Sequence, residues 1–502
     1  MLTSDALRIR AESDPDREIF RCGEDTLTYG EWHRKSSDLA RSFISQGVQQ
    51  QERVVLSFSI DEWISYVIAL LAVQKAGAVA VSVSSNLPSS TEQKVIAQTA
   101  ARHSVGQIPI PGVNYLNWLE TTQTPDPNFQ VATDPAAIAE IVVTSGSTGL
   151  PKLVACPHGN LTWDTLSADQ AASRFQNRTV QFLTHPPIGS NAAQRKVVNA
   201  LRGTSSIYNV LPVFDALTVS HLMATRRIDV VALVPAKAAA LLRACKGRSF
   251  SQVSWVHLGS AHTPPWMADG LTQLFPNAVI RNNYGLTEGG RFRIGGIYDA
   301  ARPSWIGYPA DGQSNDFSVL IMDDQGKELP TGTPGKLWIR DTTPYPRYYY
   351  GVDSSTGTTT YSADGWMCTN DIAFLEEDGS VTLVGRTSEI GNVGGLKVSL
   401  VEIEDEVAKL DCVIDCAAFK LPHRTTGDMI GIGIVSNPDD GARLELAKAR
   451  LARELGYRLP RLWISVPEIP RTFTGKVERE KLAQIAINQF PDLKVTRSGD
   501  GR

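Results

Sequence analysis

Hydrophobic positions in the first third of the chain alternate between helical and strand-like spacing. Apolar residues recur at helical spacing over residues 27–47 and then run almost continuously over 53–59. The same alternation follows over 63–76 and 77–83. Helical periods that alternate with short apolar runs predict α/β layers around a largely parallel sheet.

The rhythm returns in the middle of the chain and then changes. Helical and strand-like segments alternate again over 230–261 and 277–288. Over about 310–385, runs such as FSVLIMDD and GKLWIRD alternate with turn signals such as DDQGKELPTGTPG, which predicts an antiparallel region. After Arg386, several strand-like runs and a helical pattern over 443–455 predict a small α+β domain.

The predicted organisation is an α/β fold with two domains, because 502 residues exceed the usual size of one domain. A large N-terminal domain of layered α/β subdomains, with a small antiparallel β region, should span 1–386. The small α+β C-terminal domain should span 387–490, and a polar tail should follow over 491–502.

Composition narrows the class of protein. A net charge of -4, with 42% apolar and 20% charged residues, is typical of a soluble globular protein without attraction for nucleic acid. The longest apolar stretch, Trp63 to Val73, is too short to span a bilayer, and the N-terminus lacks the apolar core of a signal peptide. The six cysteines lack metal-ligand spacing. We therefore expect a reduced, cytoplasmic protein with no membrane span.

The stretch EIVVTSGSTGLPK, residues 140–152, suggests a phosphate-binding loop after a buried strand. Glycines let main-chain N–H groups turn towards an anion, hydroxyl side chains add donors, and a lysine adds positive charge. A solvated linker is disfavoured because a core strand leads straight into the loop. A P-loop needs Gly-Lys followed by Ser or Thr, whereas here Pro151 precedes the lysine and Leu153 follows it. The candidate residues are Thr144, Ser145, Gly146, Ser147, Thr148, Gly149 and Lys152.

Two further motifs suit a nucleotide. In NNYGLTEGG, Tyr284 could stack on a purine, Thr287 could donate to a phosphate, and Glu288 could hold magnesium. Downstream, the two oxygens of Asp371 could accept both ribose hydroxyls, and Arg386 could pair with phosphate or ribose.

Two motifs lie near the C-terminus. Gly394 and Gly395 form a flexible pair before a strand and an acidic helix. Lys476 lies in a Thr-Gly loop within PRTFTGKVERE. Each of these motifs, taken singly, is more often an ordinary turn, cap or surface loop.

Together and in this order, the motifs resemble those of the adenylate-forming superfamily, which includes acyl-CoA synthetases, adenylation domains of non-ribosomal peptide synthetases and firefly luciferase. Thr144 to Lys152 fits the superfamily's phosphate loop throughout, and Tyr284 to Glu288 fits its Tyr-Gly-x-Thr-Glu motif. Its ribose aspartate, its Gly-Arg arginine and its catalytic lysine fall on Asp371, Arg386 and Lys476. The resemblance spans essentially the whole chain.

The resemblance implies a two-step reaction. ATP and a carboxylate give an acyl-adenylate and pyrophosphate, and the acyl group then passes to a thiol of CoA or of a separate carrier protein. Magnesium on Glu288 and the ammonium of Lys476, with Thr287 beside them, would offset charge that builds on the α-phosphate. The other residues implied to line the ATP site are Gly259, Ser260, Ala261, Asn283, Tyr284, Gly285, Asp371 and Arg386.

The resemblance also implies that the small domain is mobile. It would rotate near Ser388, bringing first Lys476 and later Gly394 and Gly395 to the site. Ser388 stands where the superfamily commonly has an acidic residue or lysine, and Asn370 replaces a glycine before the ribose aspartate.

The residues expected to line the acid pocket differ more strongly from those of the superfamily. Gly189 and Ser190, with His185 nearby, stand where many members carry an aromatic or histidine gate. We expect these residues, with Gly259 and Ser260, to border the acid. No aspartate for an α-ammonium occurs over 182–196, so an aryl, fatty or other non-α-amino acid is favoured.

Three functions remain open. The first is an acid–thiol ligase. The second keeps the adenylation but uses an amine acceptor, or an unusual oxyanion as substrate. The third, a nucleotide-binding protein without activity, is disfavoured because Lys152, Glu288, Asp371 and Lys476 are all retained.

Overall fold

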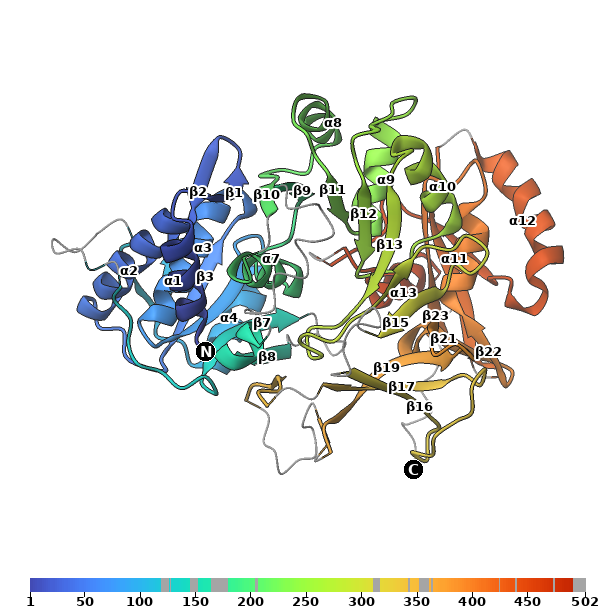
Figure 1. Ribbon diagram of the computed structural model, residues 1–502. Coiled ribbons are helices and arrows are strands. Elements are labelled where there is room, and N and C mark those ends of the chain that lie inside the picture. Colours follow the sequence, from blue (N-terminus) through green and yellow to red (C-terminus); the bar gives the residue numbers. More distant parts are fainter. Residues whose placement is uncertain are drawn as a thin grey trace.

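In the computed structural model, the described residues form three sheets (Figure 1). The description covers 1–118, 126, 128–144, 152–163, 179–203, 206–309, 317–341, 344–351, 361–362, 364–423, 425–437, 440–472 and 475–490. Within these ranges, no helix combines the length and apolar character needed to cross a membrane.

The largest sheet has one parallel and one antiparallel part. Its parallel strands, in spatial order, are β1 (Glu18–Cys22), β10 (Ser206–Val210), β9 (Val180–Thr184), β11 (Val230–Leu233), β12 (Trp255–Gly259) and β13 (Val279–Tyr284). The antiparallel part continues through β14 (Ile294–Ile297), β15 (Trp305–Pro309), β20 (Val381–Arg386), β19 (Trp366–Leu375), β17 (Gly335–Asp341) and β16 (Phe317–Met322), and β2 (Asp25–Thr28) closes the opposite edge. The predicted change to antiparallel pairing is confirmed.

A second sheet packs beside the parallel part of the first. Its order is β18 (Tyr348–Tyr349), β8 (Lys152–Pro157), β7 (Ile138–Thr144), β4 (Val79–Ser84), β3 (Arg53–Phe58), β5 (His103–Gly106) and β6 (Asn114–Tyr115). The α-helices described within the first 309 residues are α1 (Thr3–Ser13), α2 (Tyr29–Ser45), α3 (Trp63–Lys75), α4 (Ser89–Thr99), α5 (His158–Thr162), α7 (Asn191–Leu201), α8 (Ala216–Thr225), α9 (Pro235–Ala244) and α10 (Pro265–Leu274).

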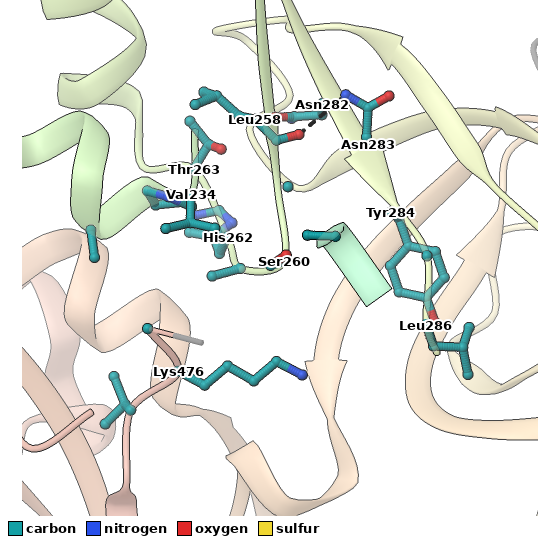
Figure 2. A pocket seen from close by; sticks show the side chains of 18 of the residues that line it. Val234, Leu258, Ser260, His262, Thr263, Asn282, Asn283, Tyr284, Leu286 and Lys476 are labelled. Carbon is teal, nitrogen blue, oxygen red and sulfur yellow. Dashed lines mark hydrogen bonds between the residues drawn. The ribbon is translucent and has the colours of Figure 1, made fainter. Parts of the chain in front are cut away.

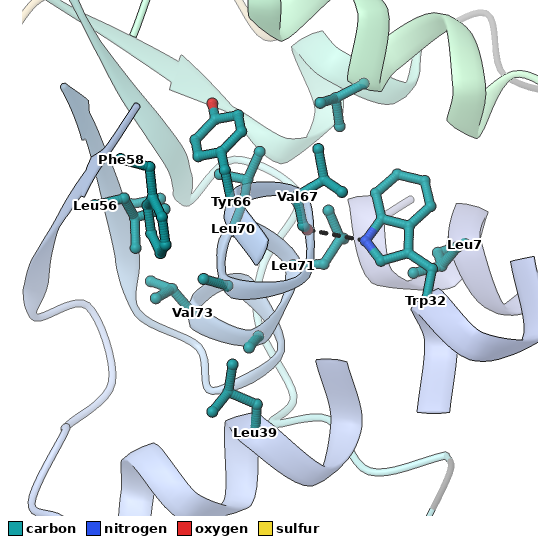
Figure 3. Packing of buried hydrophobic residues seen from close by; sticks show 14 of the residues in the cluster. Leu7, Trp32, Leu39, Leu56, Phe58, Tyr66, Val67, Leu70, Leu71 and Val73 are labelled. Carbon is teal, nitrogen blue, oxygen red and sulfur yellow. Dashed lines mark hydrogen bonds between the residues drawn. The ribbon is translucent and has the colours of Figure 1, made fainter. Parts of the chain in front are cut away.

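Helix α3 holds the two sheets together. It packs against β3 and β4 of the second sheet and against β1 and β2 of the first. The indole of Trp32 donates to the carbonyl oxygen of Val67 at 2.9 Å, which satisfies its only polar atom inside this core (Figure 3). This largely apolar helix is thus buried over most of its surface, with only Ile64, Ser65 and Ile68 partly exposed.

Acidification is expected to destabilise this region through His158 at the start of α5. The ring is buried, and burial is the main reason why its pKa is lowered from 6.5 to about 4. Only the unfolded chain takes up a proton between these values, so stability is lost as the pH falls from 6.5 towards 4. We expect about 2 kcal/mol less unfolding free energy from this group at pH 5 than at pH 7. Urea unfolding at both pH values should show a smaller loss for His158→Gln than for the parent, and equal losses would contradict the assignment.

The third sheet lies after β20. It is formed by β21 (Ile390–Val393), β22 (Leu396–Ser399), β23 (Asp415–His423), β24 (Gly427–Val435) and β25 (Leu462–Ser465), and its helices are α11 (Leu400–Ala408), α12 (Gly441–Leu455) and α13 (Arg479–Gln489). Ala418 faces a core with α11 and α12, whereas its neighbour Phe419 faces a core with α13. Alternate residues of β23 therefore serve opposite faces. The predicted α/β fold with a small α+β part is confirmed, and the exact domain boundaries stay predictions.

Candidate active site

A cleft of about 2780 Å³ opens at the carboxyl ends of β12 and β13 and is also lined by residues of the third sheet's domain. Ligands of parallel α/β sheets characteristically bind at this edge. The residues Gly259, Ser260, Ala261, Asn283, Tyr284 and Gly285 all line it.

The end of β12 has a constrained backbone. A Cβ on Gly259 would lie 2.8 Å from the carbonyl oxygen of Asn283, so only glycine fits here without a shift. Ser260 follows with a φ of 72°, in the left-handed region that non-glycine residues rarely occupy. Ser260 and Tyr284 face the same pocket (Figure 2). Strain of this kind is concentrated at ligand sites.

Asp371 is almost fully buried in the cleft. Arg386 Nε lies 3.0 Å from one of its carboxylate oxygens, and the Tyr284 hydroxyl donates to the other. Burial raises the pKa of Asp371, while Arg386 and the Tyr284 hydroxyl oppose the rise. The preceding Asn370 has a φ of 60°. Asparagine tolerates this conformation better than most residues, which accounts for its replacing glycine here.

The loop that carries Thr287 and Glu288 is held from three sides. The guanidinium of the buried Arg347 donates to the carbonyl oxygen of Thr287 at 2.9 Å. Tyr349 donates its hydroxyl to Glu288 Oε1 at 3.0 Å, and Tyr361 donates to the Glu288 carbonyl oxygen at 3.2 Å. The sequence motifs gave no sign of these three residues.

Arg347 also ties the loop to two helices. It donates to Asn160 Oδ1 at 2.8 Å and to Asn191 Oδ1 at 3.2 Å, which lie in α5 and α7. We therefore describe Arg347 as a positioning residue, because it acts on Thr287 only through the main chain.

Lys476 reaches this cleft from the small domain. Its side chain points into the pocket (Figure 2), and its pKa is lowered by burial and by Arg386, with Glu288 and Asp371 opposing the shift. The main chain of its loop is closed by a bond of 2.7 Å from Thr472 N to the Lys476 carbonyl oxygen. Lys476 and Glu288, nearly 200 residues apart in the sequence, thus line the same cleft.

Two contacts hold the small domain in this orientation. The imidazole of His262, after β12, lies 2.7 Å from Asp405 Oδ2 in α11. A Cβ on Gly475 would lie 3.7 Å from a methyl of Val234, so the Lys476 loop rests on the start of α9.

The other predicted small-domain residues lie differently. Gly394 and Gly395 form the exposed turn between β21 and β22, with φ values of 62° and 89°. They do not line the cleft in this orientation. Ser388 lies in the short 3₁₀ turn Thr387–Glu389 and does line it. Their predicted roles as thiol channel and hinge stay predictions.

Only the ends of the phosphate loop can be placed, because Ser145, Gly146, Ser147, Thr148 and Gly149 lie outside the described residues. Thr144 and Lys152 end β7 and begin β8, and the ammonium of Lys152 lies 5.4 Å from the ring centroid of Tyr349. Since Tyr349 also binds Glu288, this ring connects the two motifs.

The segment between β9 and α7 is relevant to one sequence interpretation. Gly189 does not line the cleft: a Cβ there would lie 2.6 Å from the main-chain oxygen of Ser82 in β4. Ser190 lines the cleft, but its hydroxyl caps α7 by accepting from Ala193 N at 3.2 Å. The sequence could not reveal that Gly189 faces another strand.

We expect Gly189→Ala to destabilise the protein without changing the range of acids it accepts. Its φ of 79° alone costs a non-glycine residue about 1–3 kcal/mol, and the contact with Ser82 adds to this. Gly112→Ala is a matched control, because Gly112 has a φ of 85° and open space around it. Urea unfolding should show a larger loss for Gly189→Ala than for the control. Equal losses of unfolding free energy in the two variants would contradict the prediction, because they would mean that β4 shifts to accommodate the added methyl group.

His185 lies in the cleft and is paired with a lysine. Lys237 Nζ lies 2.7 Å from His185 Nδ1 and 2.9 Å from its carbonyl oxygen. Burial and Lys237 lower the pKa of His185 to about 4, so the ring is neutral and accepts from the ammonium. Its predicted place beside the acid is consistent with this geometry.

The donor set suits magnesium. Glu288 offers a carboxylate and Thr287 a hydroxyl, and magnesium takes oxygen ligands, usually one or two carboxylates completed by phosphates and water. The described residues contain no cluster of three or more His, Cys, Asp or Glu side chains that could hold a metal without such help.

Comparisons with known proteins agree with this geometry. The AMP-binding enzyme family matches residues 7–349. The chain is 28% identical over 364 residues to 2-hydroxy-7-methoxy-5-methyl-1-naphthoate–CoA ligase of Streptomyces carzinostaticus, covering 70% of this chain and 62% of that protein. It is 25% identical over 525 residues to pseudomonine synthase PmsE of Pseudomonas entomophila, covering 96% and 83%. The chain thus spans less than two thirds of the length of the naphthoate–CoA ligase.

Solved structures share the fold across both domains. ATP-bound MatB from Rhodopseudomonas palustris has a TM-score of 0.82 at 20% identity, covering 97% of this chain and 99% of that one. MenE, the o-succinylbenzoate CoA synthetase of Bacillus subtilis, has a TM-score of 0.80 at 19% identity, covering 99% of both. The amide bond synthetase McbA of Marinactinospora thermotolerans has a TM-score of 0.79 at 21% identity, covering 96% and 99%. Since the family model matches well over half of the sequence, the chain belongs to the AMP-binding enzyme family, as its motifs predicted.

Proposed function

We propose that the chain is an AMP-forming acid ligase. It would adenylate an aryl, fatty or other non-α-amino acid with ATP, release pyrophosphate, and pass the acyl group to a thiol of CoA or of a separate carrier protein. The observation that carries the proposal is the convergence of Lys476, Glu288 and Asp371 on one cleft from different parts of the chain.

Each of these residues has a chemical task in the first step. A carboxylate oxygen of the acid bonds to the α-phosphorus, the bond from this phosphorus to the β-phosphate oxygen breaks, and pyrophosphate leaves. Asp371 would hold the ribose, and the ammonium of Lys476 would offset negative charge at the α-phosphate. Magnesium bound at Glu288 would supply further positive charge to the phosphates.

Arg347 and Tyr349 would serve this step indirectly. They fix Thr287 and Glu288 before any ligand binds, so less reorganisation is needed when charge develops. Displacement of Tyr284 is not required for ribose binding, because each oxygen of Asp371 keeps a lone pair after its present bond.

A thiol acceptor is supported by the CoA ligases and synthetases among the similar proteins. An amine acceptor is the second candidate. It is favoured by the segment after β9, where the residues of 186–191 that line the cleft are Pro186, Pro187, Ser190 and Asn191, none of which offers an aromatic gate for a pantetheine channel. The similarity in fold to an amide bond synthetase agrees with it.

ATP–pyrophosphate exchange over a panel of acids tests the adenylation step. Product masses with CoA, with a phosphopantetheinylated carrier protein and with amines then identify the acceptor. We expect exchange with at least one non-α-amino acid and a thioester product. Failure of every acid, by a folded protein that binds ATP, would overturn the proposal. An amide product without any thioester would favour the second candidate.

A further inference from the structure

The cleft continues from the strand ends along the face of the large sheet and is cationic from Gly285 onward, where a Cβ would lie 3.9 Å from Arg195 Nη1. Arg195 and Lys196 of α7 both line it. Lys196 Nζ lies 5.8 Å from the ring centroid of Phe182 and 5.7 Å from that of Tyr208. Within the described part of the chain, neither Arg195 nor Lys196 forms an ion pair with a carboxylate.

The charged groups that act on this pair are themselves cations. Burial, and then Arg195, lower the pKa of Lys196 to about 8. Burial lowers the pKa of Arg195, as do the positive charges of Arg293, Arg202 and Arg347. Burial also lowers the pKa of His257 to about 3, and the named charges beside it are Lys196, Arg281 and Arg293. The acidic residues of the cleft lie at the ATP site and in the small domain instead.

The strand register gives the depth of this region. Gly259, His257 and Trp255 are alternate residues of β12, so they lie on one face of the sheet. His257 pairs with Arg281 on β13, two residues before the pairing of Gly259 with Asn283. A step of two residues along a strand is about 7 Å, so His257 and Arg281 lie roughly that far from the strand ends, whereas the guanidinium of Arg195 lies closer to them, beside Gly285.

Aromatic rings line the next level, because Phe182 pairs with Val230 and Val230 pairs with Trp255, two residues beyond His257. Phe182 and Tyr208 pack with ring centroids 5.2 Å apart, and Trp255 lies 6.1 Å from His257. An acid that extends from the strand ends along this face would thus pass His257 and reach the ammonium of Lys196 beside these rings.

We infer that the acid activated by this chain carries a second carboxylate at its far end, bound by Lys196 and Arg195. This inference rests on the proposed function and names its substrate class: dicarboxylic acids with an aromatic or extended spacer. A buried positive pair facing a cavity is costly by itself, and a carboxylate that accepts charge-assisted hydrogen bonds would offset that cost.

The test compares acids that differ only in the second carboxylate, by ATP–pyrophosphate exchange without CoA. Terephthalate is paired with benzoate and adipate with hexanoate. We expect the parent protein to favour the dicarboxylate of at least one pair in kcat/KM by about tenfold or more, the loss expected for one charge-assisted bond. We expect Lys196→Met, which keeps the length of the side chain, to abolish this preference while the monocarboxylate rate holds or rises.

Lys448→Met is the matched control. The ammonium of Lys448 also lies over a ring, 5.0 Å from the centroid of Trp463, but on α12 outside the cleft. This variant should keep both rates. A parent without any preference for dicarboxylates, or equal losses for both acids of a pair in Lys196→Met, would overturn the inference.

The same experiment separates the inference from the proposed function. Exchange with monocarboxylates alone would overturn the dicarboxylate inference and leave the ligase proposal standing. No exchange with any acid would overturn the proposed function. A Lys196→Met variant that exchanges normally with every acid, but needs more CoA for thioester formation, would assign the cations to CoA phosphates and overturn the inference.

Discussion

Lys476→Ala is expected to slow adenylate formation by about 10²–10³-fold, the usual effect of removing one group that stabilises transition-state charge. The same variant should still transfer the acyl group from a supplied acyl-adenylate to the thiol. The physical reason is position: Lys476 belongs to the small domain, and the orientation seen here places its ammonium near Glu288 and Asp371.

The two half-reactions must be measured separately to test this. Pyrophosphate exchange reports the first, and thioester formation from synthetic acyl-adenylate reports the second. Lys409→Ala is a suitable control, because this lysine at the end of α11 is exposed, pairs with Glu406 and does not line the cleft. Equal loss of both half-reactions in Lys476→Ala, or loss of neither, would contradict a mechanism with two domain orientations.

Asp371→Ala should raise the KM for ATP by about two to four orders of magnitude. Two ribose hydroxyls would each lose a charge-assisted hydrogen bond worth about 1.5–3 kcal/mol. Binding of ATP measured by calorimetry separates this effect from a change in rate. Circular dichroism confirms folding, which matters because Arg386 loses its buried partner in this variant.

Tyr284→Phe is the matched variant for Asp371. It removes the hydroxyl that donates to Asp371 while keeping both the carboxylate and the aromatic ring. We expect a much smaller rise in the KM for ATP. Should a folded Asp371→Ala variant bind ATP like its parent, Asp371 does not hold the ribose.

Much of the site could be predicted because each motif combines residues of particular chemical types at a fixed spacing in the sequence. Tyr284 to Glu288, Asp371 and Lys476 were found from their motifs, and they line one cleft. The change from parallel to antiparallel strands was also predictable, since turn signals and short runs of apolar residues replace helical periods.

The features of the site that could not be predicted depend on contacts between segments that are distant in the sequence. Arg347 lies in no motif, and its function is visible only in its bonds to Asn160, Asn191 and the main chain of Thr287. Spacing along the chain also does not reveal that the α-carbon of Gly189 packs against β4, and its role beside the acid stays a prediction. The pairing of His185 with Lys237 likewise joins residues 52 positions apart.

The position of α3 between the two sheets restricts how this protein could have been assembled from parts. Each sheet relies on the same helix for its core, and β1 near the N-terminus pairs with β10, far along the chain. Recombination at a point between the two sheets would separate one of them from α3 and expose apolar surface on both parts to solvent. Exchange after Arg386 leaves the cores of the third sheet intact and replaces the contacts between the domains, such as that of His262 with Asp405. New acid specificity should therefore evolve by substitutions within the large domain, whereas relatives can exchange the small domain as a whole.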